Sequence, residues 1–131
     1  MLCDAAMMQR QMDWQRFSNE VNADVEIAHR GAGSSFRVLL VWGEEHHLIT
    51  VHDGAIVAID SGMLVMPQCD FALTGSEAAW QRFASERPLP RDQDIFAFFR
   101  SGDIVLSGDT RKFYAHLMCL KLMLLHLRSQ S

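Results

Sequence analysis

The chain has 131 residues, of which 49% are hydrophobic and 21% charged, a length and composition that predict a single globular domain over residues 1–131 and exclude a disordered chain. Its formal net charge is −4 and it contains no cluster of Lys and Arg, which argues against a nucleic-acid partner. The three cysteines form no CxxC pair, so the sequence predicts reduced thiols and a cytoplasmic location.

Residues 4–20 have the periodicity of a methionine-rich amphipathic helix, with Met7, Trp14, Phe17 and Val21 on one face. This face is expected to cover the core of the domain. The N-terminal segment has no continuous apolar region, and it therefore predicts no signal peptide.

Short strands separated by turn residues follow this helix. Val25 and Ile27 alternate with polar neighbours and indicate a first short strand. The segment 31–35 favours a hairpin turn over a phosphate loop, because it lacks the spacing of phosphate-binding glycines and precedes a strand. Asp53-Gly54 indicates a tight turn. The following strands are predicted at residues 36–42, 46–52 and 55–60.

These strands predict an antiparallel meander that is apolar on both faces, and such a sheet needs cover on both faces or a partner on one. An apolar run from Met63 to Met66 then ends at Pro67. The elements expected beyond it are a strand at 70–74, a helix at 76–85, a loop at 86–91, a helix at 92–100 and a strand at 103–106.

The stretch from Asp109 to Arg128 predicts one long helix with Asp109 as its N-cap. Its run of apolar residues is too short and too interrupted by charge to span a membrane. The inner stripe, which is expected to face the sheet, consists of Phe113, Leu117, Leu120, Leu124 and Leu127. The outer stripe consists of Tyr114, Met118, Leu122 and Leu125. Apolar residues on this second stripe predict a cover, which is more of the chain, a second subunit or an apolar ligand.

The residues that could carry chemistry assemble no catalytic or metal site. His46 and His52 share a face of their strand but lie about 20 Å apart, and His47 points to the other face. The pattern therefore favours solvated or edge-strand histidines over a metal site. Cys119 lies on the apolar helix, which favours a packed thiol. No cofactor is predicted, and the chain by itself is expected not to be an enzyme.

Aromatic residues gather in the two helices that precede the last strand. Trp80 and Phe83 share a helix face, and three further phenylalanines lie within residues 96–99. They form either additional core or, together with the outer stripe, the wall of an apolar cavity. In the second case the expected ligand-binding residues are Trp80, Phe83, Phe96, Phe99, Met118, Leu122 and Leu125.

The order of elements in the second half is familiar. The segment CDFALTGSEAAW at 69–80, the aromatic helix, the segment RSGDIVLSGD at 100–109 and the long helix together resemble the sterol carrier protein (type two) family. The resemblance covers about residues 20–128 and is strongest to such domains that precede α/β hydrolases. Its matching positions are Asp70, Ser76, Glu77, Gly102, Ile104, Gly108 and Asp109.

This resemblance implies an α+β fold, with a five-stranded, mainly antiparallel sheet, helices packed on it and an internal apolar cavity. It implies non-catalytic binding and transport of a fatty acid, a fatty acyl-CoA or a sterol-like lipid. The alternative is a ligand-free interaction or dimerisation module that serves as an accessory domain to a partner enzyme such as an α/β hydrolase. Both alternatives need exposed apolar residues, and the sequence leaves the choice open.

Overall fold

The computed structural model describes residues 13–62, 68–85 and 94–130. They form an α+β fold around a five-stranded mixed sheet with the strand order β3-β2-β1-β4-β5. The strands are β1 (Phe36–Trp42), β2 (Glu45–His52), β3 (Ala55–Ser61), β4 (Phe71–Gly75) and β5 (Ile104–Gly108). The helices are α2 (Trp14–Ala23), α3 (Val25–Arg30), α4 (Glu77–Phe83), α5 (Ile95–Ser101), α6 (Thr110–Ala115), α7 (Leu117–Leu125) and the 3-10 helix η2 (His126–Gln130).

The sheet is mainly antiparallel, as predicted. The meander β1-β2-β3 and the pair β4-β5 are antiparallel, whereas β4 runs parallel to β1. The turn between β2 and β3 has Asp53 at φ 53° and Gly54 at φ 78°, the left-handed conformations that a tight hairpin turn requires. The five strands predicted after residue 35 and this turn are therefore confirmed.

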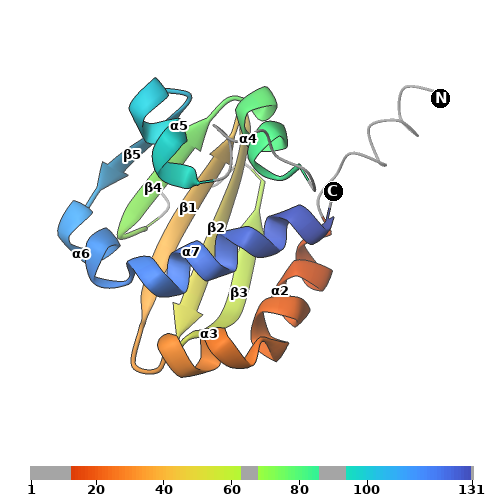
Figure 1. Ribbon diagram of the computed structural model, residues 1–131, viewed down its shortest axis with the longest axis vertical. Coiled ribbons are helices and arrows are strands. Elements are labelled where there is room, and N and C mark those ends of the chain that lie inside the picture. Colours follow the sequence, from red (N-terminus) through yellow and green to blue (C-terminus); the bar gives the residue numbers. More distant parts are fainter. Residues whose placement is uncertain (1–12, 63–67, 86–93, 131) are drawn as a thin grey trace.

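The core lies between the sheet and the helices. Figure 1 shows α7 crossing the sheet, with α2 and α3 beside it on the same face. On β1, the side chains of Phe36, Val38, Leu40 and Trp42 are buried beneath these helices. The opposite face of β2 is only half-buried or exposed. One face of the sheet is thus covered by helices, and cover for the other stays a prediction.

The segment around Val25 and Ile27 is the helix α3, and the predicted strand there is wrong. The Asp24 side chain accepts hydrogen bonds from the backbone N–H groups of Glu26 (2.9 Å) and Ile27 (3.3 Å), which starts a helical turn. Ile27 then points into the core while Val25 is 82% exposed. Because a helix precedes it, the segment 31–35 joins a helix to a strand and is not a hairpin turn.

The C-terminal helix is broken at His116, so the prediction of one continuous helix over 109–128 is wrong. Asp109 is the N-cap as predicted, since its side chain accepts from the Lys112 N–H at 3.0 Å. His116 leaves the helical region with φ −111° and ψ 21°, and its ring stacks on Phe36 at 5.2 Å. Figure 1 shows α6 and α7 running in different directions. The bend lets both halves press their apolar residues onto the same core.

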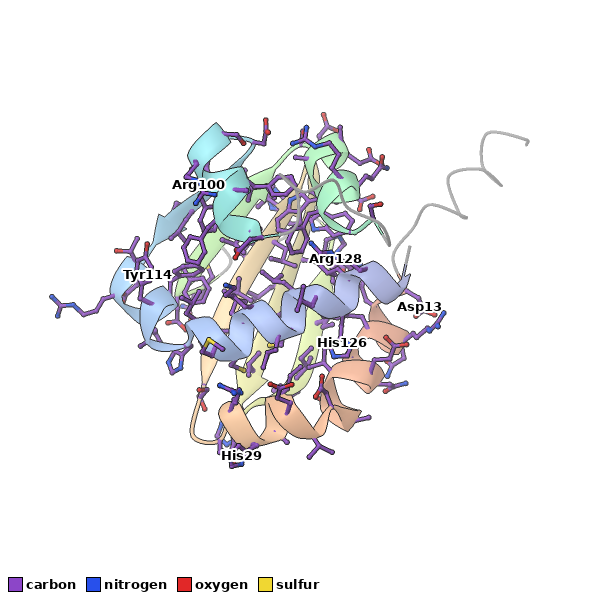
Figure 2. All side chains as sticks on the ribbon, in the orientation of Figure 1. Asp13, His29, Arg100, Tyr114, His126 and Arg128 are labelled. Carbon is purple, nitrogen blue, oxygen red and sulfur yellow. The ribbon has the colours of Figure 1, made fainter. Side chains whose placement is uncertain are left out.

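The inner stripe of the C-terminal helices is buried as predicted, apart from Leu117, which is half-buried. Three of the four residues of the outer stripe are exposed in the described part of the chain, Tyr114 at 58%, Met118 at 50% and Leu125 at 44%, whereas Leu122 is half-buried against the core. Figure 2 shows the Tyr114 side chain on α6, at the opposite end of this segment from Arg128. The fully buried members of the inner stripe are Phe113, Leu120, Leu124 and Leu127.

The N-terminal helix α2 covers the core with Phe17 and Val21, as predicted. Its predicted methionine-rich first part lies outside the described residues, as do the apolar run at 63–66 and the loop at 86–91. At the other end of the chain, His126 Nε2 lies 2.7 Å from Asp24 Oδ2. This hydrogen bond with His126 holds the pKa of Asp24 below its ordinary value. The junction of α2 and α3 is thereby tied to the start of η2.

Asn22 joins α2 to the edge strand β3 by two hydrogen bonds between its side-chain amide and the backbone of Ile56. Its Oδ1 accepts from the Ile56 N–H (2.8 Å), and its Nδ2 donates to the Ile56 carbonyl (3.0 Å). The amide thus occupies the place of a neighbouring strand. We expect Asn22→Ala to lower the free energy of unfolding by about 1–3 kcal/mol, because it leaves both backbone groups without these partners. Urea denaturation measures the loss.

Asn19 on the same helix provides the matched control. Its side chain only accepts a hydrogen bond from Gln15 at the surface. Asn19→Ala should therefore change stability by less than about 0.5 kcal/mol. Equal effects of the two substitutions would contradict the role of Asn22 at the sheet edge.

Candidate functional site

A pocket of about 240 Å³ lies between α4, α5 and α7. Phe83 comes from the end of α4 and Ile95 from the start of α5, while Leu124 and Leu125 come from the last turns of α7. These side chains make the lining predominantly apolar. Among the described residues, the polar lining comes from the ion pair of Asp94 and Lys121.

Local capping and packing place these walls. Ser76 caps α4 by accepting from the Ala79 N–H at 3.1 Å, and Asp94 caps α5 by accepting from the Phe96 N–H at 3.0 Å. Beyond α7, Arg128 Nε donates to the Phe83 carbonyl at 2.9 Å, and its guanidinium lies 4.9 Å from the centre of the Phe83 ring. The end of α4 is therefore held against the C-terminal segment.

The ion pair is the electrostatic feature of the pocket. Lys121 Nζ lies 3.1 Å from Asp94 Oδ2 and 5.4 Å from the centre of the Phe96 ring. Burial opposes ionisation of Asp94, but the Phe96 N–H and the Lys121 ammonium outweigh it and hold the pKa of this carboxyl below its usual value. Both side chains remain partly exposed. A carboxylate arriving from solvent could thus replace Asp94 as the partner of Lys121.

The pocket brings together two of the residues predicted to bind a ligand, Phe83 and Leu125. Trp80 lies elsewhere: it is fully buried, its indole N–H donates to the Val41 carbonyl at 2.8 Å, and it stacks on Trp42. Ligand binding by any of these residues stays a prediction.

The remaining predicted residues lie outside the pocket. Phe96 and Phe99 are half-buried and pack edge-to-face at 5.6 Å. Phe99 also contacts Phe113 at 5.8 Å, so this aromatic group adds to the core. On α7, Met118 and Leu122 lie along the outer stripe.

Sequence reasoning missed Lys121 and Asp94 as site residues. Lys121 is the one charged residue within α7, and it lies between the inner and outer stripes. This isolated charge on an apolar helix is the signal that could have identified it as a site residue. Asp94 lies in the predicted helix 92–100 and caps α5, but a cap alone carries no sign of a partner 27 residues away. Only packing of α5 against α7 brings the two together.

The histidines of β2 include one that sequence reasoning placed wrongly in solvent. His47 is 5% exposed and lies within the sheet on an inner strand, under Trp14, whose ring centre is 4.5 Å away. Its Nδ1 lies 2.7 Å from Ser61 Oγ and its Nε2 3.3 Å from Glu45. Burial lowers the pKa of His47, against the raising effect of Glu45. The ring of Trp14, at the start of α2, covers His47, and the alternation of residues along β2 cannot show this contact with another element.

His47 should make stability depend on pH. Because the folded-state pKa is lowered from its ordinary value of 6.5, the unfolded chain binds this proton more readily. The free energy of unfolding should therefore fall as pH drops below about 6.5 and continue to fall until the folded-state pKa is passed. Urea denaturation from pH 7 to pH 5 measures this slope.

A matched pair of variants assigns the slope to one residue. His47→Gln removes the titrating group and should flatten the pH dependence in this window. His29→Gln alters an exposed histidine on α3 and should leave it intact. Identical slopes in the two variants would show that another group is responsible.

Other reactive groups are packed or scattered. Cys119 is buried, and burial raises the pKa of its thiol, as fits the predicted packed cysteine. Within residues 13–62, 68–85 and 94–130, no group of three or more His, Cys, Asp or Glu side chains could hold a metal ion. In the same part of the chain no helix is both long and apolar enough to cross a membrane.

Solved structures resemble this fold at low sequence identity. Sterol carrier protein 2 matches with a TM-score of 0.74 and 12% identity over 93% of this chain and 98% of its own. A Thermus thermophilus protein regarded as a candidate sterol carrier protein matches with a TM-score of 0.60 and 13% identity, over 88% of this chain and 83% of its own. No protein-family model matches the sequence, and no curated protein matches it either.

One further match is a domain of a larger enzyme. A sec-alkylsulfatase from Pseudomonas matches with a TM-score of 0.53 and 17% identity, over 70% of this chain but only 14% of its own length. The fold therefore occurs both as nearly a whole protein and as part of an enzyme.

The positions that carried the sequence resemblance have structural roles here. Ser76 and Asp109 cap helices, and Asp70 accepts the Arg37 N–H at 2.8 Å. Gly102 ends α5 with φ 83°, a conformation that favours glycine. These turns and caps set the order of strands and helices after β3. The protein therefore has the sterol-carrier-protein fold that the sequence resemblance implied.

Proposed function

We propose that the protein binds a long amphipathic ligand, such as a fatty acid or another acyl lipid, and that it does so without catalysing a reaction. The observation that carries this proposal is the apolar pocket between α4, α5 and α7 with a lysine at its rim. The apolar lining suits a hydrocarbon chain, and Lys121 suits an acid group at one end. The fold shared with sterol carrier protein 2 supports it.

The size of the pocket indicates how such a ligand lies. At about 240 Å³ it is smaller than the roughly 300–1,000 Å³ of pockets that enclose drug-sized ligands. A long chain would thus fill the pocket with one part and extend along the outer stripe with the rest. Leu125 belongs to both surfaces, since it lines the pocket and is 44% exposed. The apolar surface that the described residues leave open would then be covered by ligand.

Titration with the naturally fluorescent cis-parinaric acid tests this proposal. Leu125→Glu should weaken binding at least tenfold, because it places a charge in the apolar path of the ligand. Val25→Glu is the matched control on an exposed valine of α3, outside the pocket lining and the outer stripe, and should bind as the wild type does. Absence of saturable binding, or equal binding by both variants, would refute the proposed site.

The role of Lys121 can be tested separately. Lys121→Gln should weaken binding of the fatty acid by roughly tenfold, the loss expected for one charge-assisted hydrogen bond. Binding of the corresponding long-chain alcohol, which has no charge to pair, should change little. A similar loss for acid and alcohol would show that Lys121 does not bind the head group.

The second candidate function is a ligand-free interaction module. The exposed outer stripe favours it, because Tyr114, Met118 and Leu125 could equally pack against a second copy or an enzyme partner. The occurrence of the fold within the sec-alkylsulfatase also supports a partner domain. Native mass spectrometry separates the two: co-purified lipid supports the carrier, and a ligand-free dimer that Met118→Glu dissociates supports the module.

A further inference from the structure

A second pocket, of about 440 Å³, lies at one end of the inner strands of the sheet, where β1 and β4 begin and β2 ends. Its lining is polar and includes three basic side chains from three separate elements: Arg37 from β1, His52 from β2 and Lys112 from α6. It shares no lining residue with the apolar pocket between α4, α5 and α7. Whatever this pocket binds is therefore independent of the proposed lipid site.

The acidic residue of this pocket, Asp70, is already engaged. Its Oδ2 accepts the backbone N–H of Arg37 at 2.8 Å and lies 3.1 Å from Lys112 Nζ. The Arg37 guanidinium is exposed, and among the described residues it has no ionic partner. Since Asp70 offsets only one of the two permanent cations, the pocket keeps a net positive charge in a chain whose formal net charge is −4.

The neutral polar groups complete the arrangement. Ser35 Oγ accepts the Asp53 N–H at 3.2 Å and lies 3.3 Å from His52 Nδ1, so the hydroxyl orients the imidazole. A guanidinium offers paired donors that match two oxygens of a phosphate, and an ammonium offers a compact charge for a third. Both Arg37 and Lys112 line this pocket, and Lys112 also pairs with Asp70, so the Arg37 guanidinium is the cation that remains without a carboxylate among the described residues.

We propose that this pocket is a binding site for a phosphate monoester. Arg37 makes the paired contact, Lys112 supplies the second positive charge, and His52 and Ser35 lie at the side of the bound group. The volume exceeds that of a bare phosphate ion, so a small organic group can enter with it. The phosphate belongs either to a dissolved metabolite or to a lipid head group, and both present the same chemistry.

Calorimetric titration with glycerol 3-phosphate tests the soluble source, and sedimentation with phosphatidic acid in phosphatidylcholine vesicles tests the lipid source. We expect saturable binding in one of the two, weakening as salt is raised. Arg37→Gln should weaken it at least tenfold, as for loss of a charge-assisted contact. Arg111→Gln is the control: it removes the same charge from an exposed position beside Lys112, outside the pocket lining, and should change binding less than twofold.

Asp70→Asn should change the affinity for phosphate in the opposite direction. The amide oxygen can still accept the Arg37 N–H, but the negative charge is lost and Lys112 is released, so phosphate should bind several-fold more tightly. Thermal melts confirm that each variant is folded. No binding to either probe, equal losses in Arg37→Gln and Arg111→Gln, or weaker binding in folded Asp70→Asn would each overturn the proposal.

Discussion

Replacing Trp80 by alanine is expected to destabilise the fold by about 3–5 kcal/mol, the cost of removing a large aromatic side chain from a packed core. Trp80 is 0% exposed, stacks on Trp42 with ring centres 5.4 Å apart, and packs edge-to-face on Phe83. Its indole N–H donates to the Val41 carbonyl. Substitution of a residue in the wall of an open cavity would lower the free energy of unfolding by less, because part of its side chain already lacks packed neighbours. Urea denaturation followed by circular dichroism measures the difference.

Trp80→Phe separates the hydrogen bond from the packing. Phenylalanine keeps most of the apolar volume but leaves the Val41 carbonyl without the indole donor, so we expect a loss of about 1–3 kcal/mol. The alanine variant should therefore be clearly less stable than the phenylalanine variant. A loss below about 1 kcal/mol in Trp80→Ala would mean that the site is not packed core.

Replacing Leu120 by alanine is expected to cost about 2–5 kcal/mol. Leu120 is on the inner stripe of α7, is fully buried, and belongs to the same core as the strands β1 and β4. The surrounding side chains come from the sheet as well as from helices, so they cannot all move in to fill the space. Chemical denaturation at constant pH gives the value directly.

Met118→Trp on the outer stripe is the matching test. Met118 lies two residues from Leu120 but is half exposed, so a larger side chain can extend into solvent. The substitution should therefore change the free energy of unfolding by less than about 0.5 kcal/mol. If lipid extends along this stripe, the same variant should alter lipid affinity. Destabilisation as large as that of Leu120→Ala would show that the outer stripe is ordinary core.

The elements that sequence patterns predicted correctly are those whose signals are local. Asp53-Gly54 supplies the left-handed turn residues that place β2 beside β3, and Asp109 supplies the cap of α6. The inner stripe follows from helical periodicity, because Phe113 on α6 and Leu120 on α7 each lie on the buried face of their own helix. Each of these signals lies within a few residues of the element that it specifies.

The failures occurred where a distant contact outweighs a local pattern. Val25 and Ile27 alternate like strand residues, yet the cap at Asp24 and burial of Ile27 favour a helix. His116 interrupts the C-terminal helix where its ring stacks on Phe36, which is 80 residues earlier in the chain. The cap at Asp24 is a local signal, but the burial of Ile27 and the stacking of His116 on Phe36 depend on other parts of the molecule, which no window of sequence around these residues contains.

The sequence patterns determined the strands after residue 35, their turns and caps, and the two apolar stripes of the C-terminal segment, because turn residues, caps and periodicity act through neighbouring backbone. The α+β fold with a five-stranded sheet followed from the family resemblance. Only the tertiary structure decided how far the apolar residues outside the inner stripe are buried. It placed Trp80 in the core and Met118 on the surface, and it joined Lys121 to Asp94 at the rim of a pocket. The physical reason is that burial and ion pairing depend on which surfaces meet when elements pack, and residues distant in sequence meet only in the folded chain.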